Sequence, residues 1–201
     1  MLYMSEIVKV KKLKVAWGIT GAGDKIAEIV EVMKELKKES EGKVEIEVYM
    51  SKASETMLKF YGLDEEVKKS FAKVSVEINS NSPFLAAWMQ SGKYEFLLIA
   101  PASSNTIAKI ANSISDTMLT NAALMALKAF QQVYVLPTDY RESVVYTKLP
   151  NGKDMKLRVR KEEADQVRKL ESMDGMHVLE SPQKMKEFFL EWLKNTKNRV
   201  G

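Results

Sequence analysis

The pattern of apolar and polar positions alternates between two periods along the first two thirds of the chain. Residues 44–50 alternate apolar and charged side chains, which is typical of a strand with one buried face. Residues 24–38 place apolar side chains at i, i+3, i+4 and i+7, which is typical of an amphipathic helix. The same patterns predict further strands at 14–19, 74–78, 94–100 and 133–136, and helices at 51–61, 82–90, 105–111 and 121–130. Because strands alternate with helices, we expect a parallel sheet covered on both faces.

Local signals indicate where some of these elements begin and end. Asp24 stands where the N-cap or first-turn acid of a helix belongs. Ser82 and Pro83 have the order of an N-cap followed by a first helical residue. Pro101 follows the apolar run 96–99 and is expected to end that central strand.

The last third of the chain has a different texture. Residues 143–160 predict a hairpin that turns at Asn151–Gly152, with Met155, Leu157 and Val159 alternating against Lys156, Arg158 and Arg160. A short helix at 161–170, a strand at 176–179 and a helix at about 181–197 follow. We interpret residues 143–180 as an insertion on a core of about 13–140, and residues 1–201 as a single domain.

Composition narrows the chemistry. The chain has no cysteine and one histidine, His177, so a thiol nucleophile, a thiolate metal site and an iron–sulfur ligand set are excluded. We therefore predict no metal site and no catalytic side chain, and expect any redox chemistry to rest on an organic cofactor. No apolar run is long enough to cross a bilayer and no signal-peptide pattern opens the chain, so the expected location is cytoplasmic.

Glycines follow the first predicted strand. The turn 18–23 contains Gly18, Thr20, Gly21, Ala22 and Gly23 before a helix. Glycines let the backbone approach a ligand, and a helix N-terminus favours a phosphate. The spacing is neither G-x-G-x-x-G nor a Walker loop, so a tight strand-to-helix turn is an equal alternative.

Hydroxyl side chains follow two other predicted strands. Ser51 and Ser54 come after the second strand, where they would bond a phosphate or simply cap a helix. After the strand 94–100, small and hydroxylated residues leave room for a flat ligand at a helix start. These residues are Ala102, Ser103, Ser104, Asn105 and Thr106, and a second polar group at 113–121 contains Asp116. A structural interpretation is that both stretches are capped helices.

The segment 101–106 (P-A-S-S-N-T), with the later segment 115–121 (S-D-T-M-L-T-N), resembles the family of homo-oligomeric flavin-containing decarboxylases. Residues 82–88 and 136–139 are most similar to its archaeoflavoprotein and dihydromethanopterin-reductase branch. The resemblance implies a Rossmann-like three-layer α/β/α fold, FMN as cofactor, and trimers or multiples of trimers. It implies that the 20–23 loop and Ser51 hold the FMN phosphate, that residues 103–106 contact FMN, and that Asp116 shapes the site across a subunit interface.

Some family features are missing. The comparable stretch 71–82 has no histidine base, residues 137–141 replace the substrate-binding motif of the cysteine decarboxylases, and a flap cysteine is excluded. The resemblance therefore implies flavin binding for this chain more strongly than it implies decarboxylation. We expect an FMN-dependent electron-transfer protein or reductase, and so an oxidoreductase, with a dihydropterin as one candidate acceptor. The alternatives are a cysteine-type decarboxylase, a flavin prenyltransferase, and a flavin store or simple carrier. The prenyltransferase would need a prenyl-phosphate clamp of basic and hydroxyl residues near Arg141, which the sequence does not clearly provide.

Basic side chains concentrate on the predicted hairpin. Lys156, Arg158 and Arg160 form a ribbon that would attract an acidic electron donor such as a ferredoxin, although most charge runs are solvated faces. His177 lies outside the region of resemblance, and a lone histidine of this kind is usually structural or solvated.

Overall fold

The computed structural model describes residues 12–149 and 151–196. Its main sheet has six parallel strands in the order β3-β2-β1-β4-β5-β8. The strands are β1 (Leu13–Ile19), β2 (Val44–Met50), β3 (Lys73–Val76), β4 (Phe96–Ala102), β5 (Gln132–Pro137) and β8 (Met176–Val178). Strands β1 and β4, which lie in the middle, bury nearly every side chain, as expected for a sheet covered on both faces.

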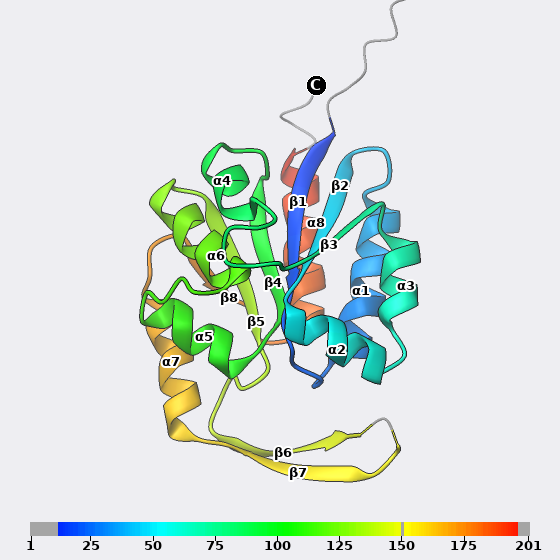
Figure 1. Cartoon of the computed structure of the whole chain (residues 1–201), viewed down its shortest axis with the longest axis vertical. Coiled ribbons are helices and arrows are strands. Elements are labelled where there is room, and N and C mark those ends of the chain that lie inside the picture. Colours follow the sequence, from blue (N-terminus) through cyan, green and yellow to red (C-terminus); the bar gives the residue numbers. More distant parts are fainter. Residues whose placement is uncertain (1–11, 150, 197–201) are drawn as a thin grey trace, which may run out of the picture.

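Helices pack on both faces of this sheet, which confirms the predicted three-layer α/β/α fold (Figure 1). One face carries α1 (Ile26–Glu39), α2 (Lys52–Phe60), α3 (Asp64–Ser70) and α8 (Pro182–Thr196). The other carries α4 (Leu85–Gln90), α5 (Ser104–Ala111), α6 (Met118–Lys128) and α7 (Lys161–Glu171). Each face has its own cluster of buried apolar side chains.

A two-stranded hairpin lies outside the layers. Strands β6 (Ser143–Lys148) and β7 (Asp154–Val159) pair antiparallel with each other in a separate sheet. The hairpin runs across the end of the molecule below α2 and α5 (Figure 1). The predicted insertion 143–180 is thus partly extension and partly core, because α7 packs on α5 and β8 pairs with β5.

The strand order fixes where a ligand site is expected. The chain runs outward from β1 to β2 and β3, then returns to place β4 on the other side of β1. The carboxyl ends of β1 and β4 therefore form a topological switch point, where open α/β sheets bind ligands. In Figure 1 this end of the sheet faces the hairpin.

Two helix starts differ from the prediction. Asp24 does not cap α1, because Lys25 takes a left-handed conformation (φ 57°) and the helix begins at Ile26 without a side-chain cap. Ser82 and Pro83 do not open α4. The carbonyl of Ser82 accepts the N–H of Ile78 in a turn, and the helix starts at Leu85.

Pro101 does not end β4, which continues to Ala102. The pairing of β4 with β5 shifts register between Ile99 and Ala102. The ladder therefore does not need a backbone N–H at Pro101, which proline lacks. Helix α3 was not predicted, because its short charged sequence contains a single large apolar residue, Val67, and shows no helical period.

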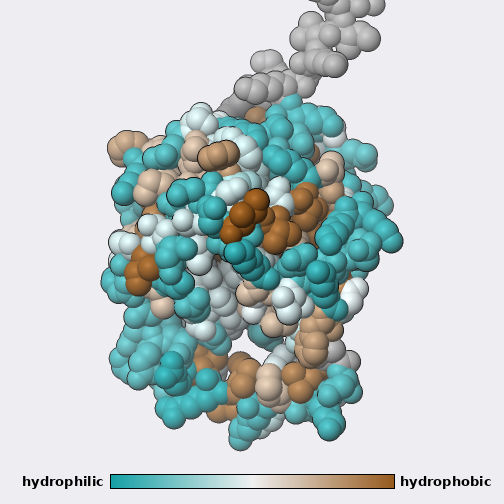
Figure 2. Space-filling model, viewed as in Figure 1, coloured by the Kyte–Doolittle hydropathy of each residue, from teal (hydrophilic) through white to brown (hydrophobic). Residues whose placement is uncertain are grey.

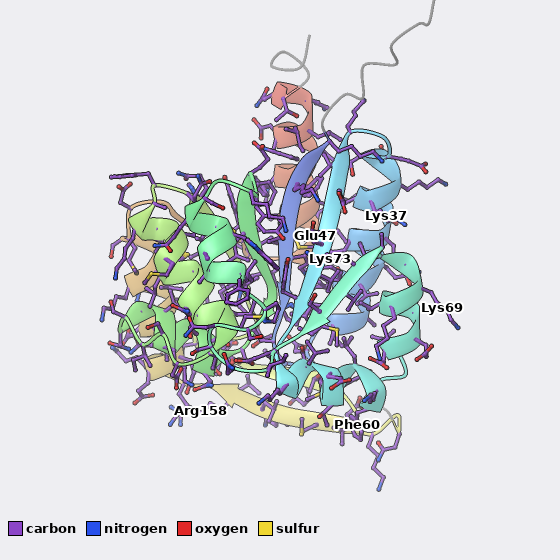
Figure 3. The ribbon with its side chains drawn as sticks, turned by 45° about the horizontal axis from the view of Figure 1, so that its top comes forward. Lys37, Glu47, Phe60, Lys69, Lys73 and Arg158 are labelled. Atoms are coloured by element: carbon purple, nitrogen blue, oxygen red, sulfur yellow. The ribbon has the colours of Figure 1, made fainter. Side chains whose placement is uncertain are left out.

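A buried carboxylate lies in the sheet. Glu47 on β2 has a side chain only 1% exposed. Its oxygens accept hydrogen bonds from Lys14 (2.8 Å), Lys73 (2.5 Å), Tyr94 (2.5 Å) and Tyr49 (3.0 Å). Figure 3 shows Glu47 and Lys73 together on neighbouring strands. Burial raises the pKa of Glu47, but these hydrogen bonds outweigh it and hold the pKa well below its usual range.

Among the described residues, no helix combines the length and apolar character needed to cross a membrane.

Candidate cofactor site

A cavity of about 340 Å³ opens at the carboxyl ends of β1, β4 and β5. It lies between the body of the protein and the hairpin, and Figure 2 shows this opening above the apolar side chains of the hairpin. Its walls come from the loop after β1, from α2, from the loops after β4 and β5, and from the hairpin. The lining residues are Gly21, Ala22, Gly23, Asp24, Met57, Phe60, Tyr61, Ser103, Ser104, Thr138, Asp139, Val145, Thr147, Leu149, Met155 and Leu157.

The polar wall joins two segments that are far apart in the sequence, residues 21–24 and 103–104. Ser103 is the N-cap of α5, and its hydroxyl accepts the N–H of Thr106. The next N–H groups, at Ser104 and Asn105, belong to the first turn and have no partner within the helix. These groups and the helix dipole favour an anion at this wall.

Thr20 organises this wall from behind. Its side chain is 2% exposed, and its hydroxyl donates to the carbonyl of Pro101 at 2.8 Å. The same oxygen accepts the N–H of Ser103 at 2.8 Å. Thr20 therefore fixes the loop after β1 to the loop after β4, and does not itself line the cavity.

The glycines of the first loop have different roles. A Cβ at Gly18 would lie 2.7 Å from Leu119 in the core, so Gly18 permits packing of α6 on β1. A Cβ at Gly21 would lie 2.6 Å from the Cβ of Ala53, and one at Gly23 would lie 2.6 Å from the hydroxyl of Tyr61. The last two glycines line the cavity and also let α2 approach it closely.

Ser51 and Ser54 use their hydroxyls within α2. Ser51 caps the helix by accepting the N–H of Ser54 at 3.1 Å, and the hydroxyl of Ser54 donates to the carbonyl of Ser51 at 2.8 Å. Ser54 is fully buried, and neither residue lines the cavity.

The other predicted site residues, in and after the β4–α5 segment, do not line the cavity, and each has another position in the structure. Ala102 is buried at the end of β4, and the hydroxyl of Thr106 lies 3.1 Å from that of Ser103. Asn105 lines an adjoining hollow of about 370 Å³ beside Arg160. Asp116 is exposed, pairs with Lys109 at 2.9 Å, and does not line the cavity within a single chain.

The apolar wall was not identified from the sequence. Phe60 on α2 is 61% exposed and Leu157 on β7 is 44% exposed, yet both line the cavity. Figure 3 shows Phe60 on the part of α2 nearest the hairpin. The alternation along residues 155–159 was the signal for the hairpin's share of this wall, since Met155 and Leu157 face inward.

Both ends of the hairpin are held to the body. The hydroxyl of Tyr140, just before β6, lies 3.0 Å from Glu180, which also pairs with Arg141 at 3.2 Å. Burial raises the pKa of Tyr140. After β7, the backbone N–H of Arg160 donates to Glu163 at 2.9 Å. The hairpin is thus anchored at its two ends and free of the main sheet between them.

The outer face of the hairpin carries cations and an aromatic ring. The ammonium of Lys156 lies 5.9 Å from the ring centre of Tyr146, its cross-strand partner, and Tyr146 is 70% exposed. Arg158 is 4.0 Å from Glu142. Arg160 is instead paired closely with Glu163 at the start of α7. The positive charge of the predicted basic ribbon is therefore least neutralised at Lys156 and Arg158.

His177 lies on the edge strand β8, away from the cavity. Its ring stacks on Tyr134 with centres 4.6 Å apart, and its Nε2 is 2.6 Å from Gln132. Burial lowers the pKa of His177. These contacts agree with a structural role.

The fold and the site define a Rossmann-like α/β protein with an anion-favouring cavity at the topological switch point. The model of the flavoprotein family matches residues 4–191, and the chain belongs to this family. An uncharacterised protein of Methanocaldococcus jannaschii is 40% identical over 187 residues, covering 93% of this chain and all of that protein.

Two further relatives carry functional names. Dihydromethanopterin reductase (acceptor) of M. jannaschii is 29% identical, over 88% of this chain and 96% of that protein. The crystal structure of DmrB from Burkholderia xenovorans in complex with FMN, described as a cubic protein cage for redox transfer, is 31% identical with a TM-score of 0.78. It covers 92% of this chain and 98% of its own. These relatives confirm the resemblance to the dihydromethanopterin-reductase branch.

Proposed function

We propose that the cavity binds FMN and that the protein is an FMN-dependent reductase or electron-transfer protein. The observation that carries this proposal is the juxtaposition of two walls. One is the anion-favouring start of α5 at 103–104 beside the glycine loop 21–24, and the other is the apolar surface of α2 and the hairpin. FMN has the same two parts, a phosphate and a flat, largely apolar ring. The relatives DmrB, with bound FMN, and dihydromethanopterin reductase support the proposal.

The residues present fit this cofactor. The first-turn N–H groups of α5 and the hydroxyls of Ser103 and Ser104 would hold the phosphate without a lysine or arginine, and none is found among the described lining residues. Gly21 and Gly23 add no side chains to this wall and allow α2 to approach it, whereas Ala22 and Asp24 of the same loop contribute theirs. Thr20 supports these groups from behind, because its hydroxyl accepts the backbone N–H of Ser103 at the wall, whereas Ser51 caps α2.

When bound, FMN would supply electron or hydride transfer, which no side chain of this chain can perform. The chain's own residues bind the cofactor and exclude water from it. Met57, Phe60 and the inner face of the hairpin place apolar atoms around the ring position. Lower polarity there strengthens the hydrogen bonds that orient the cofactor.

For the reaction partners, we propose a dihydropterin as acceptor and a ferredoxin-like acidic protein as donor. The name of the M. jannaschii relative supports the acceptor. Lys156 and Arg158, with the exposed ring of Tyr146 across from Lys156, support a docking face on the outer side of the hairpin. A flavin prenyltransferase would need a clamp for a prenyl phosphate, and Arg141 was the candidate cation for it. Because Arg141 is paired with Glu180, it does not favour the prenyltransferase alternative.

We also propose that copies of this chain assemble, as trimers or multiples of trimers. The relative DmrB forms a cage. Ile78 and Phe84, near α4, are 66% and 64% exposed, and Figure 2 shows an apolar patch on this face. Ala122, Ala123 and Ala126 of α6 are buried within the chain, so they do not add to such a contact surface.

The test is titration of FMN and riboflavin into cofactor-free protein, followed by flavin fluorescence. FMN is expected to bind at least tenfold more tightly than riboflavin, since the phosphate contributes charge-assisted hydrogen bonds. In Ser104→Asp, a carboxylate at the helix start repels the phosphate, so the preference for FMN should disappear. Ser172→Asp, at the end of α7, is the matched control and should keep it. Protein that takes up neither flavin contradicts the proposal.

A further inference from the structure

The cavity contains a carboxylate that the cofactor does not account for. Asp139 follows β5 and lines the cavity beside Thr138, and the lining also contains a second carboxylate, Asp24 of the loop after β1. Within the described residues, its side chain forms one hydrogen bond, from the hydroxyl of Thr138 at 3.3 Å, and no salt bridge. No described lysine or arginine lines the cavity to neutralise it.

A free carboxylate is unfavourable beside an anionic cofactor. The phosphate is negative, and the flavin ring gains electron density when it is reduced, so both repel a carboxylate in a cavity of low polarity. The flavin ring does not compensate, because the N–H of its pyrimidine edge lies between two carbonyls that would oppose the carboxylate oxygens. A second ligand with two adjacent N–H donors would satisfy Asp139.

We propose that Asp139 is a specificity-determining residue that binds the 2-amino-4-oxopyrimidine edge of the acceptor. That edge presents a ring N–H next to an exocyclic amino group, and the pair matches the two oxygens of one carboxylate. This inference rests on the proposed FMN-dependent function and names the acceptor as a ring system that carries this edge, as pterins do.

The apolar wall completes the recognition. Phe60 and Leu157 are large, exposed side chains at the same cavity, and they would cover the flavin together with the flat ring whose edge meets Asp139. The polar edge fixes orientation and the apolar faces supply contact area. A 2,4-dioxopteridine has the same shape and carries a carbonyl where the amino group would be, so Asp139 rejects it.

The experiment measures binding of 6-methylpterin and 6-methyllumazine, which differ only at that position, to FMN-loaded protein by isothermal titration calorimetry. Wild-type protein is expected to prefer the pterin at least tenfold, because the lumazine places a carbonyl against the carboxylate. Asp139→Asn presents an amide donor to that carbonyl and should lose or reverse the preference. Glu142→Gln removes a carboxylate three residues away that does not line the cavity, and should behave as wild type.

The outcomes separate the inference from the proposed function. FMN-loaded wild-type protein that binds both probes equally, or neither, overturns the inference and leaves the FMN site intact. An unchanged preference in Asp139→Asn also overturns it, with the flavin spectrum and melting temperature showing that the variant is folded. The wild-type comparison stands whether or not the variant folds. Failure to take up FMN overturns the proposed function instead.

Discussion

The hydroxyl of Thr20 accepts the backbone N–H of Ser103 at 2.8 Å, and so joins residues that are 83 positions apart. The same hydroxyl donates to the carbonyl of Pro101. One buried side chain thereby sets the separation of the two strand ends that frame the cavity. The polar wall of the cavity depends on this link, although Thr20 does not line the cavity.

Thr20→Val removes this link while keeping the shape of the side chain. The N–H of Ser103 loses its partner at a half-buried position, which should lower the free energy of unfolding by about 1–3 kcal/mol. The affinity for FMN should also fall, since the wall is no longer fixed. Urea unfolding and flavin titration measure the two effects. Thr20→Ser keeps the hydroxyl and should remain close to wild type in both; equal losses in the two variants would contradict the argument.

Gly21→Ala tests the close approach of α2 to the cavity. The new Cβ would lie 2.6 Å from that of Ala53, so α2 must shift, at a cost of about 1–3 kcal/mol. Thermal unfolding should show a lower melting temperature. Ala53→Gly in the same chain removes the nearest atom and should restore part of the loss. Two variants whose effects simply add would show that the predicted contact does not exist.

Glu47→Gln tests the buried carboxylate. The change leaves Lys14 and Lys73 without their main partner, and we expect a loss of about 3 kcal/mol, limited by the partial exposure of both lysines. Chemical denaturation at neutral pH measures this loss. The conservative change Tyr49→Phe should cost less, because it removes the hydrogen bonds of one neutral hydroxyl, to Glu47, Tyr94 and Lys73, and keeps the carboxylate with its lysines.

The same carboxylate predicts a dependence on pH. The folded pKa of Glu47 lies below the unfolded value of about 4.3, so its contribution is fully present above that value. As pH falls below about 4, the unfolded chain binds the proton first and the contribution is progressively lost. Unfolding free energies measured from pH 6 to pH 3 should therefore fall more steeply in wild type than in Glu47→Gln. Parallel curves would contradict the assignment.

Charge reversal tests the outer face of the hairpin. Lys156→Glu with Arg158→Glu should slow reduction by an acidic iron–sulfur protein at least tenfold at low salt, and high salt should reduce the difference. Stopped-flow absorbance of the flavin follows the rate. Lys38→Glu with Lys69→Glu makes the same change of net charge on α1 and α3, away from the hairpin, and is the matched control (Figure 3 labels Lys69). Equal slowing in both variants would indicate a general effect of charge.

Much of the fold follows from local pattern. The alternation along β2 predicted its bounds, and the Asn151–Gly152 turn predicted the hairpin, because both signals act within a few residues. Helix α3 was missed because one apolar side chain gives no period. The start of α4 was wrong because a turn bonded through Ser82 replaced the expected cap.

The site was less accessible from sequence. Loop residues such as Gly21 and Ser103 were identified, because glycines and hydroxyls after strands carry a local meaning. Phe60, Asp139 and Leu157 were not, because only the folded chain brings α2, the end of β5 and the hairpin to one cavity. Thr20 and Ser54 were assigned to the ligand, yet their hydroxyls bond to the protein itself.

The alternation along β7 has a consequence for how this protein can change. Met155 and Leu157 face the cavity, whereas Lys156 and Arg158 face outward. Substitutions at odd positions would alter which acceptor fits, and those at even positions would alter which donor docks, each without disturbing the other. Insertion of a single residue between Val159 and the anchor at Arg160 would exchange the two faces and so disturb both proposed functions, whereas insertion of two would preserve the facing. Between its paired residues and Arg160, strand β7 therefore tolerates changes of length only in steps of two residues.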